Sequence, residues 1–187
     1  MKKIYLIRHT APEVERNICY GQTDLALKPT FEQEAEAIKQ VIPNHEQIPF
    51  WTSPLQRCYL LAQKLNPNQI TIDERLKEIN FGDWEMKPWN EIPERELMPW
   101  MGNFVNMRTP NGESYLDLNE RALNCWNEII KLPHETIGIV THYGIIQSLL
   151  ANLLHIPFEK AFRLQLDYGN VFLVTLNREL VRVKFLK

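Results

Sequence analysis

The sequence predicts an α/β fold in three layers, α/β/α, with a mostly parallel sheet that has an antiparallel edge. Short apolar runs rich in β-branched residues alternate with amphipathic helical patterns along most of the chain, as in βαβ units. The last two apolar runs follow each other directly and indicate a hairpin. With 187 residues and 44% hydrophobic content, the chain is expected to form one domain, 1–187, with a sizeable core.

The first third of the chain predicts a strand, a long loop and a helix. Residues 3–7 are apolar apart from the leading lysine and predict a short buried strand. Residues 11–29 carry turn formers without a sustained period, which predicts a long functional loop. Thr30 is expected to cap a helix that ends near Val41, with Gln33 completing a capping box.

A second strand is predicted at 48–52, directly before a strong helix start. Ser53 is expected to cap this helix, Pro54 suits the first helical position, and Gln56 completes a capping box. This places Arg57 in the first helical turn, where the helix dipole already favours anions. The helix is expected to end near Asn66, and a third strand follows at 69–72.

The composition changes between about 82 and 110, where tryptophan, methionine and proline gather. We interpret this stretch as an insertion that carries one or two short helices. Its apolar side chains could cover a pocket, but we expect most of them to pack the insertion onto the core, since aromatic and methionine side chains are usually core residues.

The second half of the chain continues the alternation. Ser114 and Asp117 are expected to open an amphipathic helix that runs to about Lys131. A buried strand is predicted at 136–140 and a helix at 145–154. The final runs, 170–176 and 180–185, predict the edge hairpin, with its turn at Asn177-Arg178.

Composition limits the class of protein. The net charge of −2 rules out a broadly basic nucleic-acid surface. The three cysteines, Cys19, Cys58 and Cys125, form no C-x-x-C pair, which indicates neither a zinc knuckle nor a disulfide framework and fits a reducing compartment. No signal peptide is recognisable, and no run approaches the ~20 apolar residues of a membrane span. We therefore expect a cytoplasmic protein without a nucleic-acid or membrane partner.

Two separate strands are each followed by a histidine. Arg8 and His9 end the first apolar run, and Thr141 and His142 end the strand predicted at 136–140. If these strands are parallel neighbours, both rings reach the same sheet edge, where open α/β sheets bind ligands. Arg57 can join them from its helix start. Cations and imidazoles that converge in this way call for an anion, and guanidinium groups match phosphate best.

Two other interpretations of this group of residues stay open. Histidines can bind a metal, but the adjacent arginine and the lack of an H-x-x-x-H spacing disfavour a metal site. Alternatively, the pocket only binds an anion, as a sensor or carrier module does. A suitable proton donor would argue against that second interpretation.

At these residues the sequence resembles the histidine phosphatase superfamily, which includes the cofactor-dependent phosphoglycerate mutases. The matching motifs are R-H-T, S-P-L-Q-R, L-K-E-I-N-F-G-D-W-E and T-H-Y-G, in the family's order and over nearly the whole chain. Within the superfamily, C-Y-G-Q-T-D, P-N-G-E-S and L-D-Y-G-N look most like the α-ribazole phosphatase group. The resemblance implies a phosphoglycerate mutase-like fold and no metal or other cofactor.

The resemblance also implies a mechanism. His9 would attack phosphorus and become a phosphohistidine, while Arg8, Arg57 and His142 would hold the phosphoryl oxygens. Glu78 would protonate the leaving oxygen and then activate water. The residues alone do not separate Glu78 from its alternatives, which are Asp83, Glu85 and Glu113.

The resemblance places several further residues at the substrate. Besides Arg8, Arg57 and His142, the expected substrate-binding residues are Tyr20, Gly21, Gln22 and Tyr143. Tyr143 stands where the family usually has a small residue, and Gln147 where this group often carries arginine. An aromatic base could stack on Trp84, Trp89 or Tyr143.

The sequence therefore predicts a metal-independent phosphomonoesterase for a small-molecule substrate, α-ribazole 5′-phosphate in cobalamin nucleotide-loop assembly. The alternatives are a generic small-molecule phosphatase, a phosphoglycerate mutase-type enzyme and a non-catalytic anion-binding module. The edge hairpin could pair with another subunit in a homodimer.

Overall fold

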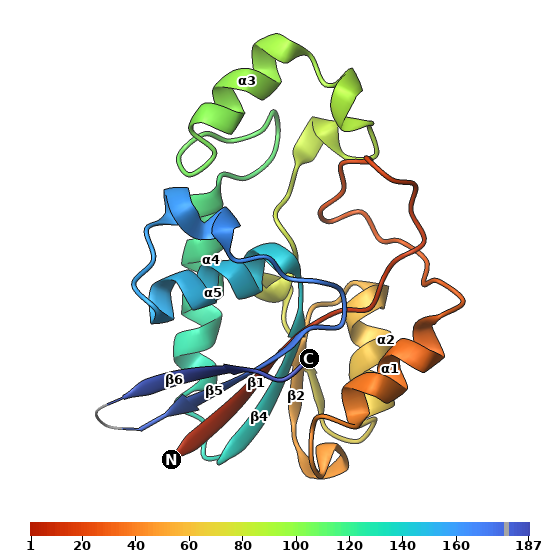
Figure 1. The fold of residues 1–187 in the computed structure, drawn as a ribbon, viewed down its shortest axis with the longest axis vertical. Helices are drawn as coiled ribbons and strands as arrows, with labels where there is room; N and C mark the ends of the chain where they lie inside the picture. Colours follow the sequence, from red (N-terminus) through yellow and green to blue (C-terminus); the bar gives the residue numbers. More distant parts are fainter. Residues whose placement is uncertain (178–179) are drawn as a thin grey trace.

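The computed structural model describes residues 1–177 and 180–187 and has the three-layer α/β/α arrangement that the sequence predicts (Figure 1). The strands are β1 (Lys2–Arg8), β2 (Phe50–Thr52), β3 (Ile70–Ile72), β4 (Thr136–Thr141), β5 (Val171–Leu176) and β6 (Val181–Phe185). The α-helices are α1 (Phe31–Lys39), α2 (Gln56–Leu65), α3 (Glu94–Gly102), α4 (Tyr115–Ile129) and α5 (Tyr143–Leu153). Short 3-10 helices are η1 (His45–Gln47), η2 (Glu74–Leu76), η3 (Gly82–Trp84), η4 (Trp89–Glu91) and η5 (Phe158–Arg163).

The strand order across the sheet is β3-β2-β4-β1-β5-β6. The first four strands in this order are parallel, whereas β5 and β6 form the predicted antiparallel edge. Arg178, in the expected hairpin turn, lies outside the described residues. Arg8 pairs with Thr141 across β1 and β4, so the next residue of each strand, His9 and His142, leaves the sheet at the same edge.

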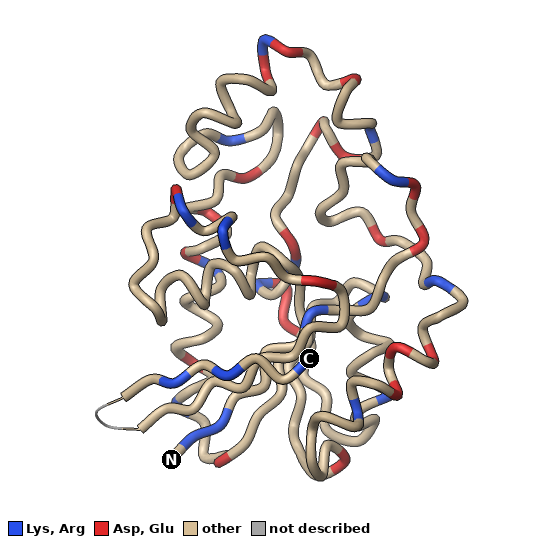
Figure 2. Tube along the Cα trace, viewed as in Figure 1, with Lys and Arg blue, Asp and Glu red and all other residues tan. Residues whose placement is uncertain are grey.

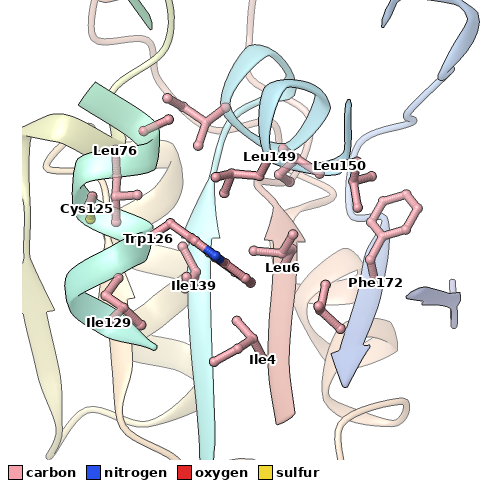
Figure 3. Packing of buried hydrophobic residues seen from close by; sticks show 14 of the residues in the cluster. Ile4, Leu6, Leu76, Cys125, Trp126, Ile129, Ile139, Leu149, Leu150 and Phe172 are labelled. Carbon is pink, nitrogen blue, oxygen red and sulfur yellow. The ribbon is translucent and has the colours of Figure 1, made fainter. Parts of the chain in front are cut away.

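Helices cover both faces of the sheet, α4 and α5 on one side and α1 and α2 on the other (Figure 1). Successive strand residues alternate between the faces, so a strand covered on both sides is apolar throughout. In β1, Ile4 and Leu6 pack with Trp126 of α4 (Figure 3), whereas Tyr5 and Ile7 pack against α1 and α2. This explains the continuous apolar run at 4–7.

The prediction that Ser114 and Asp117 open α4 is confirmed, and the two residues form a capping box. The Ser114 Oγ accepts a hydrogen bond from the Asp117 backbone N at 3.2 Å, and the Asp117 carboxylate accepts one from the Ser114 N at 2.9 Å. The capping box predicted for α1 is wrong. Thr30 precedes this helix, but its hydroxyl donates to the Glu34 carboxylate at 2.6 Å instead of accepting from the backbone N of Gln33.

The predicted start of α2 is also wrong. The helix begins at Gln56, after Leu55 in an extended conformation, so Pro54 lies outside it. The first backbone N–H, that of Gln56, donates to the distant Asp24 carboxylate at 2.8 Å and not to a local cap. The Ser53 Oγ lies 2.8 Å from the Nε2 of His142, a residue distant in sequence. Ser53 therefore holds a side chain of the sheet edge and does not cap the helix.

The segment 82–110 forms η3, η4 and α3 at the end of the molecule remote from β6 (Figure 1). Trp84 and Trp100 are buried there with Cys19 and Ile92 in an apolar cluster of their own, which we call the tryptophan cluster. The expectation that most apolar side chains of this segment pack inward is wrong for its methionines, since Met86, Met98, Met101 and Met107 are exposed. That the segment is an insertion in one domain stays a prediction.

Acidic and basic residues are interspersed along the trace (Figure 2), in keeping with the net charge of −2. Among the helices of residues 1–177 and 180–187, none combines the length and the apolar character that crossing a membrane requires.

Candidate active site

His9 lies directly after β1, at the carboxyl edge of the sheet. Its backbone N donates to the Thr141 carbonyl at 3.0 Å, and its carbonyl accepts from Gly169 N at 3.0 Å. The ring Nδ1 lies 2.7 Å from the Thr10 carbonyl. Because a carbonyl oxygen only accepts, Nδ1 carries the proton in this contact and Nε2 keeps its lone pair. The ring is almost fully buried, with 2% exposure, yet lines a cavity.

His142 lies beside His9, with 5.0 Å between the ring centroids. The Arg57 Nε donates to its Nδ1 at 3.3 Å. Since arginine cannot accept, Nδ1 of His142 is unprotonated, and its Nε2–H donates to the Ser53 Oγ at 2.8 Å. The two histidines thus hold opposite tautomers, each fixed by a partner with a single possible role.

Both arginines reach the same place, as predicted. The Arg57 guanidinium is fully buried and donates to the carbonyls of Gly21 at 2.5 Å and Thr23 at 2.9 Å. The Arg8 guanidinium donates to the Leu166 carbonyl and lies 4.0 Å from the centroid of the Tyr168 ring. The four side chains predicted to meet are therefore brought together, but Arg8 and His9 line the cavity whereas Arg57 and His142 are not among its lining residues.

The surroundings keep both histidines neutral. Burial, and then the charges of Arg57 and Arg8, hold the pKa of His9 well below its ordinary value of 6.5, against a smaller opposite effect of the Thr10 carbonyl. Burial, Arg57 and His9 hold the pKa of His142 well below 6.5 in the same way. A neutral His9 with a free Nε2 is the form in which imidazole acts as a nucleophile.

Glu78 is the acidic residue that the structure places at this cavity, which has a volume of about 200 Å³. Its carboxylate accepts hydrogen bonds from the backbone N of Ile79 at 2.9 Å and of Gly144 at 3.1 Å. Tyr143, which was also predicted at the substrate, lines the cavity as well.

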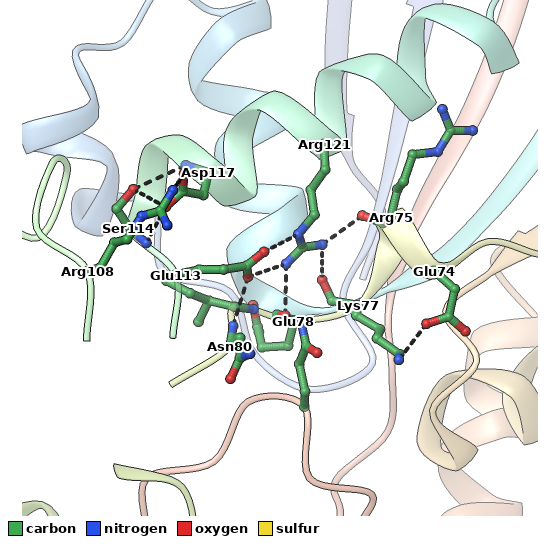
Figure 4. A network of polar contacts seen from close by, with 12 residues as sticks. Glu74, Arg75, Lys77, Glu78, Asn80, Arg108, Glu113, Ser114, Asp117 and Arg121 are labelled. Carbon is green, nitrogen blue, oxygen red and sulfur yellow. Dashed lines mark hydrogen bonds and ion pairs between the residues drawn. The ribbon is translucent and has the colours of Figure 1, made fainter. Parts of the chain in front are cut away.

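The three alternative acids bond elsewhere and do not line the cavity. Glu85 accepts from the backbone N of Gln22 and Thr23 in the 11–29 loop. Asp83 accepts from the Asn111 amide at 3.0 Å. Glu113 is paired with Arg121 on α4 (Figure 4).

The 11–29 loop supplies one lining residue, Tyr20. Its hydroxyl bonds the Tyr168 hydroxyl, and its ring lies 5.6 Å from the Arg57 guanidinium. Gly21 and Gln22 do not line the cavity. Gly21 packs against the Ile79 carbonyl so closely that an added Cβ would lie 1.9 Å from it, and Gln22 donates to the Glu78 carbonyl at 3.0 Å.

Sequence reasoning missed most of the aromatic wall of the cavity. The two tryptophans proposed to stack on a base, Trp84 and Trp89, do not line the cavity, whereas Trp100, which was not proposed, does. Phe104 and Phe162 lie in contact at 4.6 Å between ring centroids, from segments far apart in the sequence. Tyr168 belongs to the L-D-Y-G-N motif, but no sequence pattern predicted that its ring would contact the Arg8 guanidinium.

The described residues contain no group of three or more histidine, cysteine, aspartate or glutamate side chains arranged to hold a metal ion. The three cysteines are free and buried.

The chain matches a family model and several known proteins. A family model described as "Histidine phosphatase superfamily (branch 1)" matches residues 4–187. A Hydrogenobacter thermophilus protein provisionally named phosphoserine phosphatase 2 is 25% identical over 178 residues, which cover 91% of this chain and 88% of that protein. An Escherichia fergusonii protein provisionally named phosphoglycerate mutase GpmB is 30% identical over 177 residues, which cover 89% of this chain and 81% of that protein.

Solved structures share the fold over nearly the whole chain. Bacillus stearothermophilus YhfR is 27% identical with a TM-score of 0.87, covering 99% of this chain and 96% of its own. The α-ribazole phosphatase from Shigella flexneri is 21% identical with a TM-score of 0.88, covering 98% of this chain and 95% of its own.

Proposed function

Since this chain belongs to branch 1 of the histidine phosphatase superfamily, we propose that it hydrolyses a small phosphomonoester through a phosphohistidine, without a metal ion or other cofactor. The observation that carries the proposal is the state of His9. Its Nδ1 is committed to the Thr10 carbonyl, its Nε2 carries the lone pair without a hydrogen bond among the described residues, and two guanidinium groups lie beside it. A phosphoryl dianion matches this charge and this nucleophile.

The first step transfers the phosphoryl group. The Nε2 lone pair of His9 attacks phosphorus as the bond from phosphorus to the ester oxygen breaks. Arg8, Arg57 and His142 stabilise the charge on the phosphoryl oxygens. The protonated carboxyl of Glu78 gives its proton to the ester oxygen, so the alcohol leaves uncharged.

The second step restores the enzyme. Water attacks the phosphohistidine, and the Glu78 carboxylate takes a proton from this water. The bond from phosphorus to Nε2 of His9 breaks, and inorganic phosphate leaves. Glu78 can serve in both steps because its carboxyl group lines the same cavity as His9 and is held by two backbone N–H groups.

The test is phosphate release from an aryl phosphate in excess chelator. We expect turnover to continue with the chelator, to vanish in His9→Ala, and to persist in His134→Ala, which removes an exposed histidine. Wild-type enzyme quenched during turnover should carry an acid-labile phosphate that His9→Ala lacks. Complete loss of activity on chelation would overturn the metal-free mechanism, and turnover by His9→Ala would overturn the nucleophile.

For the substrate we propose α-ribazole 5′-phosphate, on the strength of the motifs C-Y-G-Q-T-D, P-N-G-E-S and L-D-Y-G-N. The relatives' names also include phosphoserine and phosphoglycerate enzymes. A comparison of kcat/KM across α-ribazole phosphate, phosphoserine and other small phosphates decides among them. Equal values across the panel would leave a generic phosphatase.

Two alternative functions are separated by the same assays. A phosphoglycerate mutase would move phosphate between the hydroxyls of phosphoglycerate, whereas a phosphatase releases it. A non-catalytic anion-binding module would show no turnover for His9→Ala to abolish.

A further inference from the structure

Most of the cavity wall is apolar. Its apolar lining consists of Ile79, Phe81, Trp100, Phe104, Leu118 and Phe162. Among the described residues that line the cavity, Arg8 is the only cation, because His9 is held neutral. The proposed mechanism uses Arg8 for the phosphoryl group and Glu78 for the ester oxygen. A second anionic group on the substrate would therefore meet no cation of its own.

Gln147, on α5, adds a hydrogen-bonding group to this wall, and its orientation is fixed. The Tyr143 hydroxyl donates to the Leu164 carbonyl at 3.1 Å, which leaves its oxygen as the acceptor for Gln147 Nε2 at 2.9 Å. The amide oxygen, Oε1, is then buried without a partner among the described residues. A buried acceptor without a donor is unfavourable, so it is suited to an O–H or N–H of a ligand.

Two donors in the same wall are also unpartnered within the described chain. These are Trp100 Nε1 and the Tyr115 hydroxyl, and both residues are buried. Burial and the nearby Glu78 and Tyr143 raise the pKa of Tyr115, so its hydroxyl keeps its proton. These groups can bond neutral hydroxyls or ring nitrogens, but they supply no charge to balance a carboxylate.

We propose that the cavity selects phosphomonoesters of uncharged, largely aromatic alcohols, and that Gln147 Oε1 accepts a hydrogen bond from the alcohol part. The proposal rests on the phosphatase function proposed above and narrows its substrate class. The proposed selectivity disfavours phosphoserine and phosphoglycerate. Their carboxylates would lose water in the cavity and would face Gln147 Oε1 and aromatic rings.

The test compares naphthyl phosphate with its carboxylated analogue, which share a scaffold and differ in charge. We expect the wild-type enzyme to favour the uncharged ester in kcat/KM by about 100-fold, the discrimination that an apolar pocket shows against an added polar group. Gln147→Arg should reduce this preference by about tenfold by adding a cation. Gln40→Arg, which adds the same charge on the exposed end of α1, should leave it unchanged.

Gln147→Met tests the hydrogen bond without adding charge. We expect it to raise KM for a hydroxynaphthyl phosphate by about tenfold while leaving KM for unsubstituted naphthyl phosphate nearly unchanged. Equal turnover of the charged and uncharged esters by the wild-type enzyme would overturn the substrate class. Equal effects of Gln147→Met on both uncharged esters would overturn the role of Gln147. If the wild-type enzyme hydrolysed none of the esters, the phosphatase proposal itself would be overturned, and this inference with it.

A second, independent observation concerns Arg121 on α4, which forms hydrogen bonds with the backbone of the segment that carries Glu78 (Figure 4). Its guanidinium donates to the carbonyls of Arg75 at 2.7 Å, Lys77 at 2.6 Å and Glu78 at 2.9 Å. It also makes two bonds of 2.9 Å to the Glu113 carboxylate. Glu113 in turn accepts a hydrogen bond at 2.9 Å from the backbone N of Asn80, which follows Glu78 in the chain.

We infer that Arg121 is a positioning residue for Glu78, an inference that depends on the acid role proposed for Glu78. In Arg121→Met, kcat/KM should fall by tenfold or more for an alkyl phosphate, whose leaving group needs a proton. It should change little for nitrophenyl phosphate, whose leaving group departs as an anion. Glu78→Gln is the reference and should show the same selectivity for the alkyl ester.

The outcomes separate the two claims. If Glu78→Gln slows both esters equally, Glu78 is not the acid and both claims fail. If Glu78→Gln is selective but Arg121→Met slows both esters equally, Arg121 only supports the fold and the positioning role is overturned.

Discussion

The two buried imidazoles at the sheet edge link catalysis to stability through protonation. Their folded-state pKa values lie well below 6.5, while an unfolded histidine titrates near 6.5. Below pH 6.5 the unfolded chain therefore binds more protons than the folded one, so the free energy of unfolding falls as the pH falls. At pH 6.5 an unfolded histidine is half protonated, so the pH dependence from these two groups fades over about the next pH unit.

The first prediction follows from this sign. Urea unfolding measured between pH 5 and pH 8 should show a free energy of unfolding that is level toward pH 8 and declines as the pH falls through about 6.5. His9→Gln should reduce that slope by up to about 1.4 kcal/mol per pH unit, the share of one proton. His134→Ala, at an exposed histidine, should not change the slope. An unchanged slope in His9→Gln would show that His9 charges in the folded protein.

The second prediction concerns Gly144, whose backbone N holds the Glu78 carboxylate. A Cβ at this position would lie 2.4 Å from Glu78 Oε1 and 3.1 Å from Leu118 Cδ1. Gly144→Ala should therefore displace the carboxylate and lower kcat/KM by about tenfold or more, because misplacing a catalytic group is costly. Gly102→Ala is the matched control, since a Cβ there would meet nothing within 4 Å. Equal activity of the two variants would contradict the account of Glu78.

At the scale of the element, similar cap patterns had different outcomes. The pattern at Ser114 formed a capping box with Asp117. The pattern at Ser53 did not, because its hydroxyl bonds His142 from across the sheet. Local sequence shows which groups are able to cap, but a distant residue that competes for the same hydroxyl leaves no local signal.

The third prediction compares two helix starts. Ser114→Ala removes the bond from Asp117 N to the Ser114 Oγ but keeps the bond from Ser114 N to the Asp117 carboxylate, and it should lower the free energy of unfolding by about 1 kcal/mol. Thr30→Ala should cost less, because the Thr30 side chain caps no backbone N–H of α1. Urea denaturation of both variants checks the order. A larger loss in Thr30→Ala would show that the α1 start is capped in solution.

At the scale of the molecule, the part of the site at the sheet edge could be predicted from the sequence, whereas the aromatic wall of the cavity could not. The placement of His9 and His142 followed from one rule, that neighbouring parallel strands end at one edge, and the register of Arg8 with Thr141 confirms it. The aromatic wall follows no such rule. Trp100, Phe104 and Phe162 come from α3, the loop after it and η5, and only the packing of these irregular segments brings them together.

The last prediction tests whether the tryptophan cluster unfolds independently of the core of the sheet. Trp84 is 1% exposed, and its ring lies 5.5 Å from that of Trp100, beside the hydrogen bond from Met86 N to the Cys19 carbonyl at 2.7 Å. Trp84→Ala should remove packing worth about 3–5 kcal/mol locally. Hydrogen exchange should therefore quicken at 17–21 and 82–110, while β1 and β4 keep their protection. Met98→Ala, at an exposed side chain of α3, should leave both regions unchanged. Faster exchange throughout the sheet in Trp84→Ala would instead show that the cluster and the core unfold as one unit.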